Sequence, residues 1–446
     1  VPPKPGRTPS MTSGKPKAVF GLSEQIIFQS INNYIPNTFL SARKKRYLLR
    51  KDDLVKSIDK LGFDADNDII VAMNLNIYGI KDFEKFENKI AVLFGKQFGT
   101  MVNSGSSANL LTFEVLDIPE NAEIITPILT FATTLSPIIK KGLIPVFVDV
   151  EPETYIVNID QVKQSITSKT KALMIPSLLG NVPDLKRLRK IADDNNLIFV
   201  EDSADTLGAT FDGIPTGKFS DISTTSFYGS HIITAAGEGG MICCNNKKWD
   251  RKFKILRGWG RTSAINESEK LEDRFNVKLD DIPYDSKFIF EEIGYNFLPT
   301  EISAAFGLIQ LQKLKKFTEL RKRNFEKLYS FFSSTKFFKL PRKLPQVETS
   351  WLAFPLTISS DAPFTRLELV KYLETNGIQT RPIFTGNVLR QPAFKKINYN
   401  KHIAIGDFQV ANNIMKNSFL IGCNHGLNDH HINKIQQTFL SFLQKI

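Results

Sequence analysis

The chain has 446 residues, of which 42% are hydrophobic and 23% are charged, with a formal net charge of +12 at pH 7. This length allows one large domain with a sizeable core plus a smaller domain, and the composition excludes a disordered chain. The basic residues are spread along the sequence, so we expect no nucleic-acid partner; an attraction for anionic substrates is equally compatible with the charge.

The chain contains three cysteines, Cys243, Cys244 and Cys423, which cannot form a disulfide framework and favour a reducing, cytoplasmic location. We find no apolar run of about 18 residues in the sequence, so we expect no membrane span. The first ten residues are rich in proline and lack the hydrophobic stretch of a signal peptide.

The predicted elements begin after a mixed N-terminal arm, residues 1–80. Residues 81–95 place apolar side chains at helical spacing and end in glycine, which predicts a helix. Between about 100 and 245, short apolar runs alternate with amphipathic stretches, including a helix predicted over 184–195. The runs that predict buried strands are 124–126, 145–149, 172–176 and 197–200. This alternation predicts an α/β fold with a mainly parallel central sheet, flanked by helices on both faces.

The second half of the chain predicts a different organisation. Residues 250–290 are polar, which predicts a mobile excursion over the surface, and a helical pattern over 301–327 leads out of the large domain. A further strand is predicted at 351–357. We therefore expect three parts: an arm at 1–80, a large domain at 81–328 and a small α/β C-terminal domain at 329–446.

Ligands of parallel sheets bind at the carboxyl ends of the strands, which directs attention to the residues that end or follow each run. Asp202 ends the run that starts at Leu197, where a carboxylate can pair with a protonated ring nitrogen or simply cap the strand. Phe131 follows the first strand run, and it can line a site or belong to the core.

The segment Ser104–Asn109 precedes an apolar helix. Its small residues let the backbone approach a ligand closely, and a helix N-terminus offers N–H groups and a positive dipole to a phosphate. Most serine-rich turns before helices are plain N-caps, so this motif alone does not decide between the two roles.

The segment Ser226–His231, followed by the turn Gly237–Gly240, resembles the cofactor-anchoring segment of the sugar aminotransferase family of pyridoxal 5′-phosphate (PLP) enzymes. In that family a lysine attached to the cofactor stands where this chain has His231. Imidazole cannot form an imine, but with an unperturbed pKa of about 6.5 it can move protons at neutral pH. The resemblance implies a reaction related to transamination; the alternative is a dead or engineered site.

The resemblance also implies the aspartate aminotransferase-like fold and a site that binds PLP or its amine form, pyridoxamine 5′-phosphate (PMP). It implies that His231 is catalytic. It implies a homodimer, because the family's counterpart of Asn296 reaches the phosphate across the dimer interface. The remaining residues implied to bind the cofactor are Gly105, Ser106, Ser107 and Ser226 at the phosphate, Phe131 on the ring face, Asp202 at the ring nitrogen and Asp205 near the ring hydroxyl.

Two later segments, Gly377–Pro392 and Asn417–Gly422, resemble the nucleotide-linked 4-keto-6-deoxyhexose 3-dehydratase branch of the family, in which histidine stands at the lysine position. This implies removal of the C3 hydroxyl from such a sugar, as in deoxysugar and lipopolysaccharide O-antigen biosynthesis, with L-glutamate regenerating PMP. Two features depart from the branch: residues 33–78 look like an insertion, and Ile232 stands where relatives have a second histidine.

Part of the branch carries a [2Fe–2S] cluster and takes electrons from a reductase. Such a cluster needs four thiolates, or two thiolates and two histidines. Three cysteines, two of them adjacent in one predicted strand, do not supply these ligands, and the segment Arg257–Glu267 contains none. The cluster-free mode is therefore favoured and no metal is expected. A non-catalytic protein that binds nucleotide sugars is the other alternative.

Guanidinium groups suit a diphosphate, so Arg261, Arg381 and Arg390 are candidate substrate contacts, each with a surface ion pair as its alternative role. Asn387, in a Gly-Asn turn, is a candidate contact to the sugar, or a residue that only shapes the turn.

Overall fold

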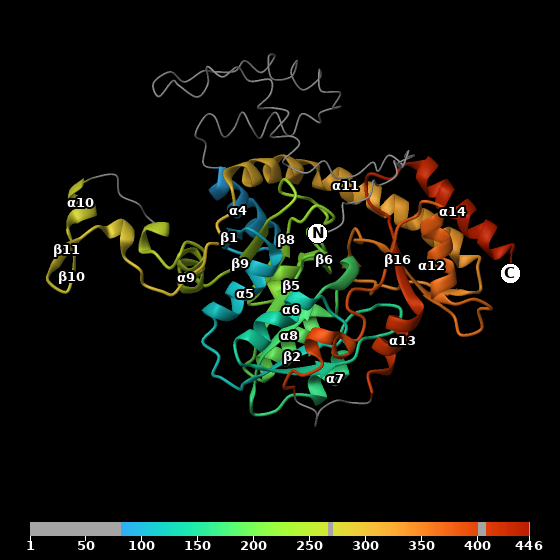
Figure 1. The fold of residues 1–446 in the computed structure, drawn as a ribbon, viewed down its shortest axis with the longest axis horizontal. Coiled ribbons are helices and arrows are strands. Elements are labelled where there is room, and N and C mark those ends of the chain that lie inside the picture. The colour runs from blue at the N-terminus through green and yellow to red at the C-terminus, as the bar shows by residue number, and fades with distance from the viewer. Residues whose placement is uncertain (1–81, 266–270, 400–406, 446) are drawn as a thin grey trace, which may run out of the picture. The chain divides into compact units, whose positions relative to one another are not determined.

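The computed structural model describes residues 82–265, 271–399 and 407–445. The arm at 1–80 and the insertion at 33–78 lie outside these residues. The central sheet has seven strands in the order β1-β9-β8-β5-β4-β2-β3 (Figure 1). These strands are β1 (Phe98–Val102), β2 (Glu123–Pro127), β3 (Ile144–Val148), β4 (Thr170–Pro176), β5 (Ile198–Asp202), β8 (Ile222–Ser226) and β9 (Gly240–Cys244).

Strand β9 pairs antiparallel with both of its neighbours, and every other neighbouring pair in the sheet is parallel. Alternate residues of a strand enter different cores, because successive side chains point to opposite faces. In β4, Leu173 and Ile175 pack in a core with α8, whereas Ala172 and Met174 pack in a core with α5. The prediction of a mainly parallel sheet with two covered faces is confirmed.

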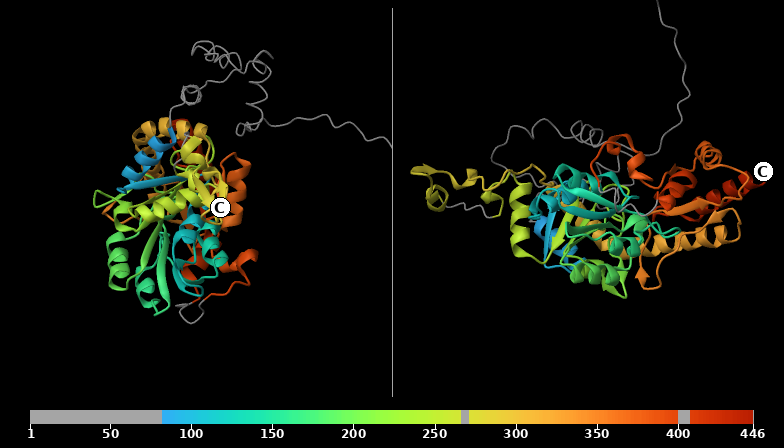
Figure 2. Two further views of the ribbon diagram at one scale, coloured as in Figure 1. Left: turned by 90° about the vertical axis from the view of Figure 1, so that its left-hand side faces the viewer. Right: turned by 90° about the horizontal axis from the view of Figure 1, so that it is seen from below.

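Helices cover both faces of this sheet (Figure 2). They are α4 (Asp82–Leu93), α5 (Gly105–Val115), α6 (Ala132–Lys140), α7 (Ile159–Gln164), α8 (Leu185–Asp194) and α9 (Lys247–Arg257). The helices predicted at 81–95 and 184–195 are α4 and α8, and the Asp184 side chain caps α8 by accepting a hydrogen bond from the Arg187 N–H. The predicted excursion was wrong at its start, since residues 250–257 belong to α9 and bury Phe253 against the core.

A second sheet, in the order β12-β14-β16-β15, is antiparallel throughout. Its strands are β12 (Phe338–Lys339), β14 (Phe354–Ile358), β15 (Thr380–Arg381) and β16 (Ser418–Ile421), and the helices α12 (Arg366–Thr375), α13 (Gln409–Asn417) and α14 (Asp429–Leu443) accompany it. Helix α11 (Glu301–Ser333) contacts α4 at one part and α14 at another. The predicted boundary at residue 328 falls inside α11, and the domain division itself stays a prediction.

Smaller elements complete the described chain. The hairpin of β10 (Val277–Leu279) and β11 (Ile282–Tyr284) follows helix α10 (Leu271–Phe275), and both project away from the central sheet (Figure 1). A third sheet joins β6 (Thr210–Phe211), β7 (Ile214–Pro215) and β13 (Val347–Glu348). Among the described helices, none has the length and apolar character that crossing a membrane requires.

Candidate active site

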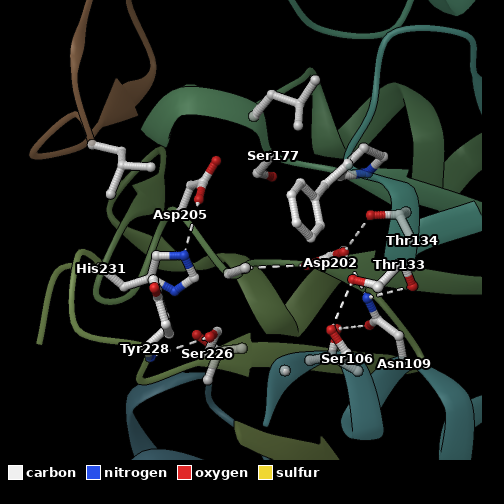
Figure 3. A pocket seen from close by; sticks show the side chains of 18 of the residues that line it. Ser106, Asn109, Thr133, Thr134, Ser177, Asp202, Asp205, Ser226, Tyr228 and His231 are labelled. Atoms are coloured by element: carbon white, nitrogen blue, oxygen red, sulfur yellow. Dashed lines mark hydrogen bonds and ion pairs between the residues drawn. The ribbon is translucent and has the colours of Figure 1, made fainter. Parts of the chain in front are cut away.

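A pocket opens where β5 and β8 end and where α5 and α6 begin (Figure 3). This is the position that a parallel sheet offers to a ligand. Most of the catalytic and cofactor residues predicted from the sequence line this one pocket, namely Gly105, Ser106, Phe131, Asp202, Asp205, Ser226 and His231.

The N-terminus of α5 forms one end of the pocket. Gly105 begins the helix, and a Cβ at this position would lie 2.7 Å from the Cβ of Ser226, so only glycine keeps the space between them open. The Ser106 hydroxyl donates to Thr133 Oγ1 at 2.9 Å. A helix N-terminus flanked by hydroxyl groups fits a phosphate. Ser107 does not line the pocket; its hydroxyl donates to Asn103 Oδ1 at 2.6 Å and so supports the turn.

The carboxylate of Asp202 lies at the floor of the pocket and is almost fully buried (Figure 3). Its Oδ2 accepts hydrogen bonds from Asn109 Nδ2 and from the Thr134 hydroxyl, both at 2.8 Å. Its Oδ1 accepts one longer bond, 3.2 Å, from the Ala204 N–H. This geometry fixes the carboxylate and leaves Oδ1 with capacity to accept a proton donor such as a protonated ring nitrogen.

Two aromatic rings, those of Phe131 and Phe384, also line the pocket. Phe131, 51% exposed, precedes α6, and its ring meets that of Phe384 edge to face at a centroid distance of 6.1 Å. An aromatic side chain with half its surface uncovered is available to stack on a flat ligand. The phosphate cradle, the acceptor at the floor and the exposed ring together fit PLP.

His231 follows β8 in a turn that is anchored on both sides. Phe227 and Ile232 are fully buried, and the His231 N–H donates to the Tyr228 carbonyl at 2.9 Å. The imidazole faces the pocket, with Nε2 at 3.9 Å from Oδ1 of Asp205 (Figure 3). Two buried residues therefore fix the backbone that carries the ring.

Burial acts on both members of this pair and favours their neutral forms. It lowers the pKa of His231 below the usual value, and it raises the pKa of Asp205 to about 7. At neutral pH the imidazole is therefore free to accept a proton, and the neighbouring carboxyl group exchanges protons in the same pH range.

Replacing Asp205 by asparagine is expected to stabilise the cofactor-free protein at pH 8 and to change little near pH 4. The pKa of Asp205 rises from 3.8 in a solvated chain to about 7 on folding, so the folded state binds the proton more tightly. Stability from this group is therefore present at low pH and is lost as the pH rises from 4 to 7, by roughly 2–4 kcal/mol. Thermal melting at several pH values measures the difference.

Asp212→Asn is the matched control, because Asp212 lies at the surface and pairs with Lys186. Equal melting temperatures of wild type and Asp205→Asn across this pH range would mean that burial does not raise the pKa of the Asp205 carboxyl group.

The remaining residues predicted to bind the cofactor or the substrate do not line the pocket of the single chain. Asn296 is exposed and forms a β-bridge with Gly258. Arg261 lies over the ring of Trp259, with 4.3 Å from its guanidinium carbon to the ring centroid. Arg381 is exposed and donates to the carbonyl of Thr380 at 2.6 Å.

The last two candidates share one partner. Arg390 Nε donates to Asn412 Oδ1 at 2.7 Å, and Asn387 Nδ2 donates to the same oxygen at 3.0 Å. The Asn387 Oδ1 also accepts from the Leu389 N–H, so this side chain caps a turn. The proposed roles of these residues toward a substrate stay predictions.

Several pocket residues were not predicted from the sequence: Asn109, Thr133, Thr134, Ser177, Tyr228, Leu352 and Phe384. Two of them carried a signal, since Asn109 closes the serine-rich motif and Thr134 follows Phe131 by three residues, one helical turn into α6. Leu352 and Phe384 come from distant segments and carried none.

The family model described as the DegT/DnrJ/EryC1/StrS aminotransferase family matches residues 72–440. Over 386 residues the chain is 36% identical to a dTDP-4-dehydro-2,6-dideoxy-D-glucose 3-dehydratase of Saccharopolyspora spinosa, covering 84% of this chain and 83% of that protein. Over 372 residues it is 37% identical to the lipopolysaccharide biosynthesis protein RfbH of Salmonella typhimurium, covering 80% of this chain and 84% of that protein.

Among solved structures, an E. coli GDP-4-keto-6-deoxy-D-mannose 3-dehydratase with bound hydrated PLP superimposes with a TM-score of 0.74 at 29% identity. The match covers 84% of this chain and 96% of that chain. The predicted fold class and the predicted cofactor, PLP, are confirmed. Because the family model matches most of the chain, the chain belongs to the DegT/DnrJ/EryC1/StrS aminotransferase family.

Proposed function

We propose that this protein removes the C3 hydroxyl group of a nucleotide-linked 4-keto-6-deoxyhexose and forms a 3,6-dideoxy-4-keto sugar, with L-glutamate as the amino donor that regenerates PMP. The observation that carries this proposal is the identity of the base. His231 lines the pocket, and no lysine does so within the described parts of the chain. The names of the two sequence relatives, a sugar 3-dehydratase and a lipopolysaccharide biosynthesis protein, support the substrate class.

The absence of a lysine amine at this position favours one of two reactions of the family. A lysine can attach to the cofactor and carry a proton to the sugar carbon that becomes aminated, which is transamination. An imidazole cannot attach, but it can accept and return protons. When bound, PMP supplies an amine that condenses with the C4 ketone and a ring that accepts electrons, and these weaken the bond to the C3 hydroxyl.

The pocket residues then have the following roles. Asp202 keeps the ring nitrogen protonated, and the turn at Gly105 with Ser226 holds the phosphate. His231 removes the proton from the cofactor carbon that bears the amine, and the same imidazole delivers a proton to the departing hydroxyl group. Asp205, at 3.9 Å, is close enough to take up or return a proton through a small movement of the ring.

The cysteines support the cluster-free mode rather than the reductase-dependent alternative. All three are buried. Cys243 and Cys244 are neighbours in β9, so their side chains point to opposite faces of the sheet, and Cys423 follows β16 in the second sheet. This arrangement does not gather thiolates at one iron site.

The test is incubation of the PMP-loaded protein with the 4-keto-6-deoxy sugars of GDP, CDP and dTDP in the presence of L-glutamate. We expect one of them to yield a sugar that is lighter by one oxygen atom, together with 2-oxoglutarate. A product that carries an amino group in place of the ketone would instead identify an aminotransferase. A requirement for iron and a reductase would favour the cluster mode, and no cofactor uptake would favour a binding protein.

We further propose that the protein acts as a homodimer whose sites are shared between two chains. The segment around Asn296 carries many exposed apolar side chains, which a second copy would cover. Ile293 is 98% exposed. The others are Leu271, Phe275, Leu279, Ile282, Tyr284, Phe288, Phe290, Leu298 and Ile302.

Mixing two inactive variants is expected to restore activity if the site is shared. His231→Asn disables the site of its own chain, whereas Asn296→Ala disables the site of the partner. A mixed dimer then holds one site with both changes and one with neither, so co-expression should give up to roughly a quarter of the wild-type activity. Steady-state rates of the mixture and of both parents measure this; a mixture no more active than its parents would contradict a shared site.

A further inference from the structure

Five polar contacts form a closed ring behind the catalytic histidine. His231 Nε2 lies 3.9 Å from Asp205 Oδ1, and Asp205 Oδ2 accepts a hydrogen bond from the Leu179 N–H at 2.9 Å. The Leu179 carbonyl accepts from the Leu352 N–H at 2.8 Å, and the Leu352 carbonyl accepts from Arg321 Nη1 at 3.0 Å. Arg321 Nη2 closes the ring by donating to the His231 carbonyl at 3.2 Å.

Arg321, in the middle of α11, is an unusual member of this ring. Its side chain is only 1% exposed. Within the described parts of the chain it forms no ion pair with a carboxylate, and its hydrogen bonds go to main-chain carbonyls alone, including that of Trp351 at 3.3 Å. Asp205 acts on its charge from a distance, but no carboxylate of the described residues contacts it. A buried cation without such a contact is costly, and an apolar residue would pack there at a lower cost. Packing alone therefore does not explain the arginine.

Two residues that contact this ring or belong to it have unfavourable backbone conformations. Leu179 has a φ of 63° and Trp351 has a φ of 48°, and both are bulky residues in the left-handed region. The two segments that carry them pack tightly against each other, since a Cβ on Gly180 would lie 2.6 Å from the Cα of Trp351. Strain of this kind persists only where surrounding contacts hold it, and it concentrates at functional sites.

We infer that Arg321 is a positioning residue whose guanidinium group fixes the main chain of His231 to the pocket wall at Leu352, and so holds the imidazole beside Asp205. The planar fork suits this task because two of its nitrogens donate in different directions at once. Nη2 donates to the carbonyl of His231, and Nη1 donates to the carbonyls of Trp351 and Leu352.

Hydrogen exchange of the cofactor-free protein tests this placement without any reaction. The amides of Leu179 and Leu352 donate within the ring. In Arg321→Met, peptides that contain these two amides and the 228–235 turn should exchange about tenfold faster or more, because the local opening becomes easier. Exchange in the distant helix α8 should stay as in the wild type.

The matched control is Arg323→Met, since Arg323 lies on the same helix two residues away, is half exposed and donates to Asn324. It should leave all of these peptides unchanged. Arg321→Lys keeps the charge but not the fork, so it should show an intermediate increase and serves as the deciding variant if Arg321→Met does not fold. Wild-type exchange of the three segments in a folded Arg321 variant would overturn the inference.

A second measurement rests on the proposed function and separates positioning from general stability. The spectral change of the bound PLP form on addition of L-glutamate should slow roughly 10- to 100-fold at saturation in Arg321→Met, as expected for a misplaced base. The half-saturating glutamate concentration and the cofactor affinity should stay near wild type, and Arg321→Lys should recover part of the rate. Weaker binding at an unchanged rate would contradict a positioning role. If no glutamate reaction occurs in the wild type, the proposed function fails while the exchange result still stands.

Discussion

Replacing His231 by asparagine is expected to slow C3 dehydration by about 10²–10⁴-fold, the usual contribution of a positioned acid–base group. Asparagine is of similar size and polarity but cannot accept a proton near neutral pH. The cofactor contacts, Asp202 and the turn at Gly105, are untouched, so cofactor affinity should change little. Initial rates of formation of the dehydrated sugar measure the first effect, and a cofactor titration measures the affinity.

The control is His430→Asn, because His430 lies exposed at the start of α14 and away from the pocket. His231→Lys is the complementary change. It should restore an amine that attaches to the cofactor, visible as a shifted absorbance that borohydride makes permanent, and dehydration should be lost. Dehydration at the wild-type rate in either His231 variant would show that another group moves the proton.

The strands that were predicted from the sequence share one physical property. β2, β3, β4 and β5 are apolar runs, as expected for strands buried on both faces. β8 was missed because it reads Ile-Ser-Thr-Thr-Ser, although all five residues are buried. Hydrogen bonds explain this burial: Thr224 donates to Asn109 Oδ1 at 2.6 Å, and Thr225 donates to the Ser203 carbonyl at 3.0 Å. A search for apolar runs cannot detect a strand that is satisfied by polar partners.

In the candidate site, too, some residues were predicted from local sequence patterns and others were missed. Asp202 was predicted because it ends an apolar run, and Gly105 and His231 were predicted because their continuous motifs resemble those of a known family. The parallel topology brings the ends of such strands together. Phe384 lies in the pocket because the segment after β15 returns to the large sheet, where the Thr385 hydroxyl donates to the Thr130 carbonyl at 2.6 Å. No local pattern indicates such a return.

Arg321 shows a further limit of pattern reasoning. An arginine within a charged stretch of a long helix predicts a solvated side chain, because arginine is rarely buried without a partner. Its burial depends on the carbonyls of Trp351 and Leu352, which a distant segment presents to α11. Such contacts follow from the tertiary structure and not from spacing.

Replacing Asp202 by asparagine is expected to weaken cofactor binding by roughly 10²–10³-fold, in line with the cost of about 3–5 kcal/mol for removing one partner of a buried charge pair. The variant would leave the proton on the ring nitrogen without a carboxylate, while Asn109 and Thr134 would still hold the side chain in place. Titration of the cofactor-free protein with PLP, followed by absorbance, measures the affinity.

The outcome also decides between the two roles that the sequence left open for Asp202. A carboxylate that only caps the end of β5 would lose stability on replacement, since its Oδ1 accepts the Ala204 N–H, but PLP affinity would stay near wild type. A carboxylate that pairs with the ring would lose PLP affinity as well, because an uncharged amide does not replace the carboxylate beside a protonated ring nitrogen. The surface variant Asp212→Asn should change neither quantity, so melting curves and PLP titrations of these three proteins separate the two roles.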